Sequence, residues 1–337
     1  MKKGLAFGKY WPMTVGHEYY LKESATKVDE LTIIVCGNET QRFMDITPRD
    51  RHIAMIRFVE DYIPNGKVIF FDDIDMPQGA ATPEESLETS SVWAEKFKEL
   101  APGTTHVCTS ERYGDEVAEF MGIEHICIDE QRSTVNISAT MIRNDVFQYW
   151  HMMNEYMQKC CTFKVCVYGP ESCGKTTVAK KLAKLFDAQF IPEHARMILP
   201  DMNLTKEVFE DIAIGQYARV FEAPPEKLIQ ICDTDLNITT AYAEWYLNNV
   251  PNIVSKLQSK EKYDLYVMLA PTVEWVNDGL RDIHHDNHRQ YMFQRLLSSM
   301  KATGTPYVII DDKNYSDRLS KAVERVGVEL FKRGLQN

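Results

Sequence analysis

Residues 163–176, FKVCVYGPESCGKT, decide the fold of the C-terminal half of this chain. The apolar run Phe163–Tyr168 leads into Gly169–Thr176, which matches the pattern G-x-x-x-x-G-K-[ST], and the helical pattern Thr177–Phe186 follows. Glycines let the backbone wrap closely around phosphates, and the loop N–H groups and the helix N-terminus supply positive potential. A strand, loop and helix in this order predict a P-loop that binds ATP.

The residues of this loop have separate expected roles. In P-loops the lysine reaches the β- and γ-phosphates and the Ser or Thr hydroxyl binds Mg²⁺. We therefore expect ATP as a co-substrate, Mg²⁺ as a cofactor bound by Thr176, and Lys175 as a catalytic residue. The residues predicted to bind ATP here are Gly169, Glu171, Ser172, Gly174, Lys175, Thr176 and Thr177.

Two carboxylates end a later apolar run. Residues 228–235, LIQICDTD, place Asp233 and Asp235 at the carboxyl end of a predicted strand. A carboxylate in this position binds Mg²⁺ or orients an acceptor hydroxyl, so Asp233 is predicted to be catalytic and metal-binding. For Asp235 two interpretations stay open, a second functional carboxylate or the N-cap of the helical stretch Asn237–Leu247.

A charged segment, Glu274–Arg281, follows the predicted strand Leu265–Ala270 and continues as DIHHDNHR. As a lid, it would bring Arg281 or Arg289 over the phosphates and exclude water. As a solvated loop it would have no such role, and both interpretations stay open. Arg281 is the candidate ATP-binding residue of this segment.

The whole chain alternates predicted strands with helical patterns, which indicates parallel sheets with helices on both faces. The pattern breaks around residues 149–162, so we predict a domain at 1–150, a linker at 151–162 and a domain at 163–337. Both domains should be doubly wound α/β units that bind ligands at the carboxyl ends of their strands. The predicted strands are Gly4–Phe7, Leu31–Cys36, Lys67–Phe71, His106–Thr109, Glu124–Ile128, Phe163–Tyr168, Leu228–Asp233, Leu265–Ala270 and Tyr307–Ile310.

Two segments of the first domain are candidate anion sites. Gly8–His17, GKYWPMTVGH, follows the first strand and opens a helix, and His17 would donate hydrogen bonds to a phosphate that gains charge. Ser138 and Thr140 open a second helix, with Arg143 one turn later. Two such sites around one five-stranded unit favour a polyphosphate ligand over two ordinary helix caps.

The bulk composition narrows the class of protein. The 337 residues are 44% hydrophobic and 26% charged, which suffices for two cores, and the net charge of -11 argues against broad nucleic-acid or membrane binding. The eight cysteines form no C-x-x-C pair and no metal spacing, which is typical of reduced thiols. With no signal or membrane-spanning pattern, we expect a cytoplasmic protein.

These motifs together resemble a known family. The Gly8–His17 loop and the segment SATMIR resemble the nucleotidylyltransferase superfamily signature, and their order before FQYW (147–150), GPESCGKT, DTD and EWVNDGLR is similar to bifunctional enzymes of the NadR type. That family pairs a nicotinamide mononucleotide adenylyltransferase with a ribosylnicotinamide kinase. The resemblance covers nearly the whole chain and implies the transferase in 1–150 and the kinase in 163–337.

The resemblance also implies roles for individual residues. His17 and Arg143 would be catalytic in the transferase, Trp93 and Trp275 would stack on flat rings, and Glu193 and Arg196 would hold the riboside together with Asp233. This chain departs from the family pattern at Thr14, where His is usual, and at His194-Ala195, which replaces an aromatic-Gly pair. The residues implied to bind ATP in the transferase are Gly8, Lys9, Thr14, His17, Ser138, Thr140 and Arg143.

The implied ligands are small molecules, namely ATP, nicotinamide mononucleotide, nicotinamide riboside and NAD. Since the first strand is expected at residue 4, a DNA-binding helix-turn-helix is not expected, whereas a homo-oligomer is possible. Two alternatives stay open on the residues alone. One is an adenylyltransferase–kinase pair for another small metabolite, such as a flavin or pantetheine precursor. The other is a nucleotide-sensing module without catalysis.

Overall fold

The computed structural model describes residues 1–337 apart from 45, 80, 199–203, 275–285 and 336–337. The chain divides into two compact units, Met1–Cys161 (unit 1) and Thr162–Asn337 (unit 2). The described residues form one five-stranded sheet in each unit. No described helix is long and apolar enough to cross a membrane.

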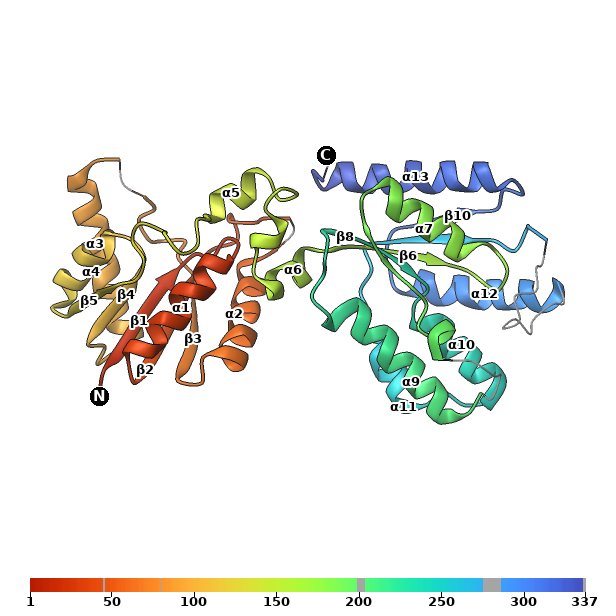
Figure 1. Ribbon diagram of the computed structural model, residues 1–337, viewed down its shortest axis with the longest axis horizontal. Coiled ribbons are helices and arrows are strands. Elements are labelled where there is room, and N and C mark those ends of the chain that lie inside the picture. The colour runs from red at the N-terminus through yellow and green to blue at the C-terminus, as the bar shows by residue number, and fades with distance from the viewer. Residues whose placement is uncertain (45, 80, 199–203, 275–285, 336–337) are drawn as a thin grey trace. The chain divides into compact units, whose positions relative to one another are not determined.

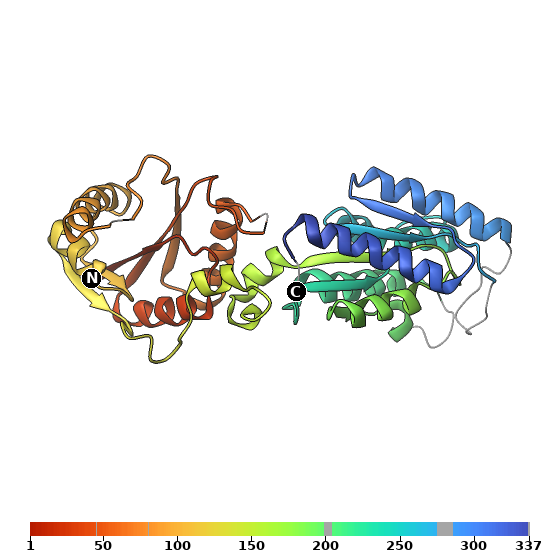
Figure 2. The same ribbon diagram turned by 90° about the horizontal axis from the view of Figure 1, so that it is seen from above.

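Unit 1 is a doubly wound parallel sheet with the strand order β3-β2-β1-β4-β5. Helices α1 and α2 lie on one side of this sheet and α3 and α4 on the other (Figures 1 and 2). Its regular elements are β1 (Lys3–Gly8), α1 (Val15–Lys27), β2 (Glu30–Cys36), α2 (Pro48–Tyr62), β3 (Gly66–Phe71), α3 (Pro83–Leu100), β4 (His106–Thr109), α4 (Tyr113–Met121), β5 (Glu124–Cys127), α5 (Ala139–Asn144), η1 (Trp150–Met152) and α6 (Glu155–Cys161).

Sequence signals explain where these helices begin. Thr47 and Thr82 each accept a hydrogen bond from the backbone N–H three residues later, and each is followed by a proline at the first helical position. Such caps satisfy donors that have no partner inside the helix. Residues 151–162, predicted as a linker, contain η1 and α6, and Tyr156 of α6 bonds Asp61 of α2 within unit 1.

Unit 2 is also a parallel sheet, with the order β10-β9-β6-β8-β7. Figure 1 shows α7 and α13 on one face of this sheet and α10 and α12 on the other. Its elements are β6 (Phe163–Tyr168), α7 (Lys175–Leu185), β7 (Gln189–Ile191), α8 (Ala195–Ile198), α9 (Lys206–Tyr217), η2 (Ala218–Glu222), β8 (Ile229–Asp233), α10 (Leu236–Leu247), α11 (Asn252–Gln258), β9 (Leu265–Leu269), α12 (Asp286–Ala302), β10 (Tyr307–Ile310) and α13 (Tyr315–Lys332).

The order of the strands fixes where ligands can bind. β1 lies between β2 and β4, and β6 lies between β9 and β8, so in each unit the chain adds strands first on one side of this central strand and then on the other. In doubly wound sheets a crevice opens at the carboxyl end of the strands at this point. The strand order therefore predicts a ligand-binding site at the loop after β1 in unit 1 and at the loop after β6 in unit 2.

Candidate functional site

The loop after β1 ends in a capping box that orients His17. Thr14 caps α1 by accepting a hydrogen bond from the His17 N–H at 3.2 Å, and its own N–H donates to His17 Nδ1 at 2.9 Å. Because Nδ1 is an acceptor, the proton of the neutral ring lies on Nε2. His17 can therefore donate one hydrogen bond into the adjoining cavity.

The environment keeps His17 neutral. Burial, together with the smaller effect of the nearby Arg132 cation, lowers the pKa of His17 to about 4. A neutral imidazole that donates through one nitrogen suits a phosphate oxygen as acceptor. Thr14 itself is buried, with its side chain used in the cap, so the structure gives it a positioning role toward His17.

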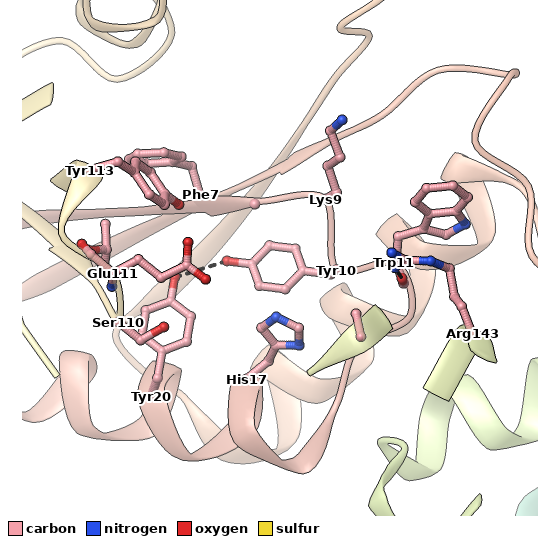
Figure 3. Close-up of a pocket in the computed structure, with 13 residues that line it drawn as sticks. Phe7, Lys9, Tyr10, Trp11, His17, Tyr20, Ser110, Glu111, Tyr113 and Arg143 are labelled. Carbon is pink, nitrogen blue, oxygen red and sulfur yellow. Dashed lines mark hydrogen bonds between the residues drawn. The ribbon is translucent and has the colours of Figure 1, made fainter. Parts of the chain in front are cut away.

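Three cavities of the described structure meet around this loop. The first, of about 400 Å³, is drawn in Figure 3 with Lys9 and Arg143 on its wall. Arg143 lies 4.4 Å from the centre of the Trp11 ring and donates to Thr140 Oγ1 at 2.8 Å, which fixes its guanidinium. The full lining is Phe7, Gly8, Lys9, Tyr10, Trp11, His17, Tyr20, Thr109, Ser110, Glu111, Tyr113, Ala139 and Arg143.

The second cavity, of about 210 Å³, brings the two predicted anion segments together. His17 lines it along with Ser138 and Thr140, although these residues are more than a hundred positions apart in the chain. Ser138 is the N-cap of α5 and accepts a hydrogen bond from the Met141 N–H, so its hydroxyl serves the helix as well as the cavity. The juxtaposition that the sequence predicted is therefore present in unit 1.

The third cavity, of about 560 Å³, is lined by Gly8, Lys9 and Trp93. The Trp93 indole N–H donates to the Pro77 carbonyl at 3.1 Å, and its ring contacts Phe97 with centroids 5.3 Å apart. Trp93 thus belongs to the core under α3 and also presents a face to the cavity. Packing in the core and stacking on a ligand ring are therefore compatible roles for Trp93.

Sequence reasoning missed a buried cation beside this region. Arg51 of α2 is 1% exposed, and its Nε and one terminal nitrogen have no hydrogen-bond partner among the described residues. Burial lowers the pKa of Arg51 to about 10, and the negative charge of Asp73 opposes that effect. The other terminal nitrogen donates to the Lys9 carbonyl. The sequence feature that could have identified Arg51 is its position on the buried face of α2, which it shares with Ala54 and Met55.

In unit 2 the P-loop has the backbone geometry that its glycines predict. Gly169 and Gly174 have φ values of +143° and +86°, and Ser172 has φ +55°. A Cβ on Gly169 would lie 2.5 Å from the Leu269 carbonyl oxygen, so no larger residue fits there. The loop curls around the N-terminus of α7, where Lys175 Nζ donates to the Pro170 carbonyl at 2.9 Å.

Asp233 meets the P-loop at the carboxyl end of β8. Thr176 Oγ1 donates to Asp233 Oδ2 at 2.5 Å, whereas Oδ1 is buried and has no hydrogen-bond partner in the described part of the chain. Burial raises the pKa of Asp233 to about 6, and the negative charge of Glu193 acts in the same direction. The Thr176 hydroxyl and the Asp233 carboxylate, whose Oδ1 is unpaired among the described residues, fit the oxygen ligands that Mg²⁺ prefers.

No group of three or more His, Cys, Asp or Glu side chains within the described ranges is arranged to hold a metal ion. A Mg²⁺ site of the nucleotide type needs only one or two protein oxygens, because phosphates and water complete the coordination. Thr176 and Asp233 remain the predicted ligands.

The second carboxylate, Asp235, follows β8 and has a structural role. Asp235 is buried and caps α10 by accepting from the Ile238 N–H, and it also accepts from Asn237 and from the Tyr266 hydroxyl at 2.9 Å. Burial raises its pKa to about 6. Of the two interpretations of Asp235, the helix N-cap is confirmed.

The segment after β7 carries Glu193 and Arg196, the two residues that the sequence predicted to hold the riboside. Glu193 pairs with Arg196 Nε at 2.9 Å, and both charges act on Asp233. The ring of His194 packs over Gly215, where a Cβ would lie 2.0 Å from its Nε2, and Arg219 donates to its Nδ1. Trp275 and Arg281, the other candidates of this unit, lie outside the described residues.

Fold and motifs define a two-unit α/β protein whose second unit is a P-loop domain. The model of the AAA domain family matches residues 164–318. The whole chain is homologous to the trifunctional NAD biosynthesis/regulator protein NadR, with 26% identity to the protein of Salmonella typhimurium and 25% to that of Escherichia coli. Each match covers 96% of this chain and 82% of the relative.

Solved structures of NadR share the fold. The complex of NadR with NR superposes with a TM-score of 0.60 at 21% identity, over 97% of this chain and 96% of that one. The complex with NAD and AMP-PNP gives a TM-score of 0.61 at 22% identity, over 100% and 97%. The fold of both units is therefore that of NadR.

Proposed function

We propose that this chain is a bifunctional enzyme of NAD biosynthesis. Unit 2 would phosphorylate nicotinamide riboside to nicotinamide mononucleotide, and unit 1 would transfer the adenylyl group of ATP to the mononucleotide. The observation that supports the proposal is that each unit has its own cluster of residues suited to a phosphate ligand, His17 with Arg143 in unit 1 and Lys175 with Asp233 in unit 2. The names and ligands of the NadR relatives support these substrates.

In unit 1 the phosphate of nicotinamide mononucleotide would attack the α-phosphorus of ATP in line, and pyrophosphate would leave. His17 Nε2 would donate to a phosphate oxygen as negative charge develops, which is why a neutral ring with a fixed tautomer is useful. Lys9 and Arg143 on the cavity wall would neutralise further charge. Gly8 lets the backbone approach the ligand, and Trp93 would stack on the nicotinamide ring.

The unsatisfied guanidinium of Arg51 suggests where the mononucleotide phosphate would sit. Its donors are buried near Lys9, whose ammonium donates to Gln78 at 2.5 Å on the rim of the third cavity. Buried N–H donors without partners are costly, and an anion bound nearby would accept from the two Arg51 donors that have no partner among the described residues and relieve that cost. The third cavity would then hold the nicotinamide nucleotide, and the first two the ATP.

In unit 2 the 5′-hydroxyl of the riboside would attack the γ-phosphorus of ATP. Lys175 would hold the β- and γ-phosphates, and Thr176 and Asp233 would hold Mg²⁺, which supplies positive charge to the phosphates. Asp233 would also orient the acceptor hydroxyl, with Glu193 and Arg196 positioning the ribose. The product of unit 2 would be the nucleotide substrate of unit 1.

We also propose a cytoplasmic setting for this chain. The eight cysteines lie in described segments and form no disulfide, which supports a reducing compartment such as the cytoplasm. The acidic net charge of -11 supports small molecules rather than DNA as ligands.

One experiment tests both activities. The full chain is incubated with Mg-ATP and nicotinamide riboside, and the products are identified by mass; we expect the mononucleotide and then NAD. Lys175→Ala should abolish riboside phosphorylation but still convert added mononucleotide to NAD. His17→Ala should stop at the mononucleotide, with adenylyl transfer reduced by roughly 10²- to 10³-fold. A folded variant that loses both activities would contradict two independent sites.

A further inference from the structure

The connection between β5 and α5 holds a tight turn that fixes one arginine. Asp129 accepts hydrogen bonds from the Ser133 N–H at 2.9 Å, the Ser133 hydroxyl at 2.7 Å and the Thr134 N–H at 2.9 Å. The Arg132 N–H donates to the Asp129 carbonyl at 2.8 Å. Asp129 and Arg132 have φ values of +52° and +51°, in the left-handed region that non-glycine residues seldom adopt. Such conformations persist only where the surroundings enforce them.

This turn places Arg132 on the wall of the second cavity. The cavity also contains His17, Ser138 and Thr140, which are the proposed phosphate ligands of unit 1. The positive charge of Arg132 is close enough to His17 to affect its protonation. After burial, it is the second cause of the lowered pKa of the His17 ring. A guanidinium therefore faces the same space as the imidazole.

The Arg132 guanidinium is paired with a carboxylate in the structure. Arg132 donates to Glu111 Oε1 at 2.9 Å, and Glu111 lines all three cavities. Its backbone is held in place because the Thr109 hydroxyl donates to the Glu111 carbonyl at 2.8 Å. Thr109 is supported in turn by His125 Nε2 at 2.9 Å, and His125 Nδ1 lies 2.7 Å from Asp115.

The pair is also accessible enough to exchange partners. The side chains of Arg132 and Glu111 are 38% and 50% exposed, so water can solvate both while the contact breaks, and such pairs contribute little net stability. Carboxylates and phosphates present similar oxygen pairs to a guanidinium, with phosphate carrying more charge. A triphosphate next to Glu111 would repel this carboxylate and attract Arg132.

We propose that Arg132 is a further triphosphate-binding residue of unit 1, and that Glu111 is the counter-ion that holds it until ATP arrives. The assignment rests on the proposed adenylyl-transfer function. Arg132 stays paired throughout, first with Glu111 and then with the triphosphate. Glu111 thereby keeps the arginine oriented and weakens ATP binding by competing for it.

The test reads ATP binding at His17 alone. In full-length protein with ¹³C-labelled histidine, the His17 signal is assigned with His17→Asn, and its shift is followed during a Mg-ATP titration. Arg132→Gln should raise the dissociation constant read at His17 by roughly tenfold or more, the effect expected on losing a charge-assisted hydrogen bond. Arg112→Gln is the matched control, since Arg112 is 87% exposed and pairs with Glu130 away from these cavities.

Glu111→Gln, alone and combined with Arg132→Gln, gives a double-mutant cycle that tests the counter-ion role. Glu111→Gln should tighten ATP binding more in the otherwise unchanged protein than in the Arg132→Gln background, because in that background only the direct repulsion between the carboxylate and the triphosphate is removed. Weaker binding in Glu111→Gln would overturn the counter-ion role. Unchanged binding in Arg132→Gln would overturn the arginine assignment while the transferase proposal stands. If ATP does not shift His17 in the unmodified protein, both proposals fail together.

Discussion

Lowering the pH should separate the two proposed activities within one polypeptide. Burial and the nearby Glu193 raise the pKa of Asp233 to about 6, so this carboxylate gains a proton as the pH falls through a range where an ordinary aspartate is fully ionised. The protonated form is a poor Mg²⁺ ligand and cannot orient a hydroxyl by accepting its proton. His17, whose pKa burial lowers to about 4, stays neutral over the same range.

The magnitude follows from these two values. Between pH 7.5 and pH 5 the ionised fraction of a group with a pKa near 6 falls about tenfold, whereas the neutral fraction of a group with a pKa near 4 falls by only about a tenth. The kinase kcat/KM, which reports the free enzyme, should therefore fall about tenfold on acidification, and the transferase kcat/KM should stay nearly constant.

The assay measures both rates with the same Mg-ATP stock at each pH, so that titration of ATP itself affects both. Asp233→Asn is the control variant, and its low residual kinase rate should lose the pH dependence between 7.5 and 5. A kinase profile that stays flat, or a transferase profile that falls in parallel with it, would refute the assignment of the titration to Asp233.

Two further predictions concern the scaffold behind the sites. Gly114→Ala should destabilise unit 1 by about 1–3 kcal/mol, because the new Cβ would lie 2.3 Å from His125 Nε2. In a thermal unfolding experiment the midpoint temperature of unit 1 should fall. Gly327→Ala is the control and should leave the midpoint unchanged, because a Cβ there would meet no described atom within 4 Å. Arg318→Met should lower the free energy of unfolding by about 3–5 kcal/mol and reduce kinase activity without affecting adenylyl transfer, because the buried guanidinium donates to the Cys173 carbonyl of the P-loop at 2.6 Å. Urea unfolding measures the stability, and both activities are assayed on the same variant. An equal loss of both activities would contradict the prediction.

Local motifs were the part of this molecule that could be predicted from sequence. The P-loop, the two Thr-Pro helix starts and the five strands of unit 1 depend on residues within a few positions of each other, and each is present in the structure. Strand β7, Gln189–Ile191, was not predicted, since three residues at the edge of a sheet show no periodicity.

Contacts across the fold were harder to predict. Arg51 and Glu111 carry no local motif, and their importance comes from the Lys9 carbonyl and from Arg132, which lie far away in sequence. Asp233 and Asp235 looked alike in sequence because both end the same strand. They differ only because Asp235 is enclosed by the start of α10 and by Tyr266, whereas Asp233 faces Thr176.

Because His194 lies so close to Gly215, the residue type accepted at either position depends on the residue at the other. Any side chain at 215 would force the imidazole to swing away from Arg219, since a Cβ there would come within 2.0 Å of the ring. A saturation library at 215 should therefore recover only glycine while position 194 is histidine. Randomising both positions together should recover bulkier residues at 215 paired with smaller ones at 194, so that covariation between these two sites can be selected in the laboratory.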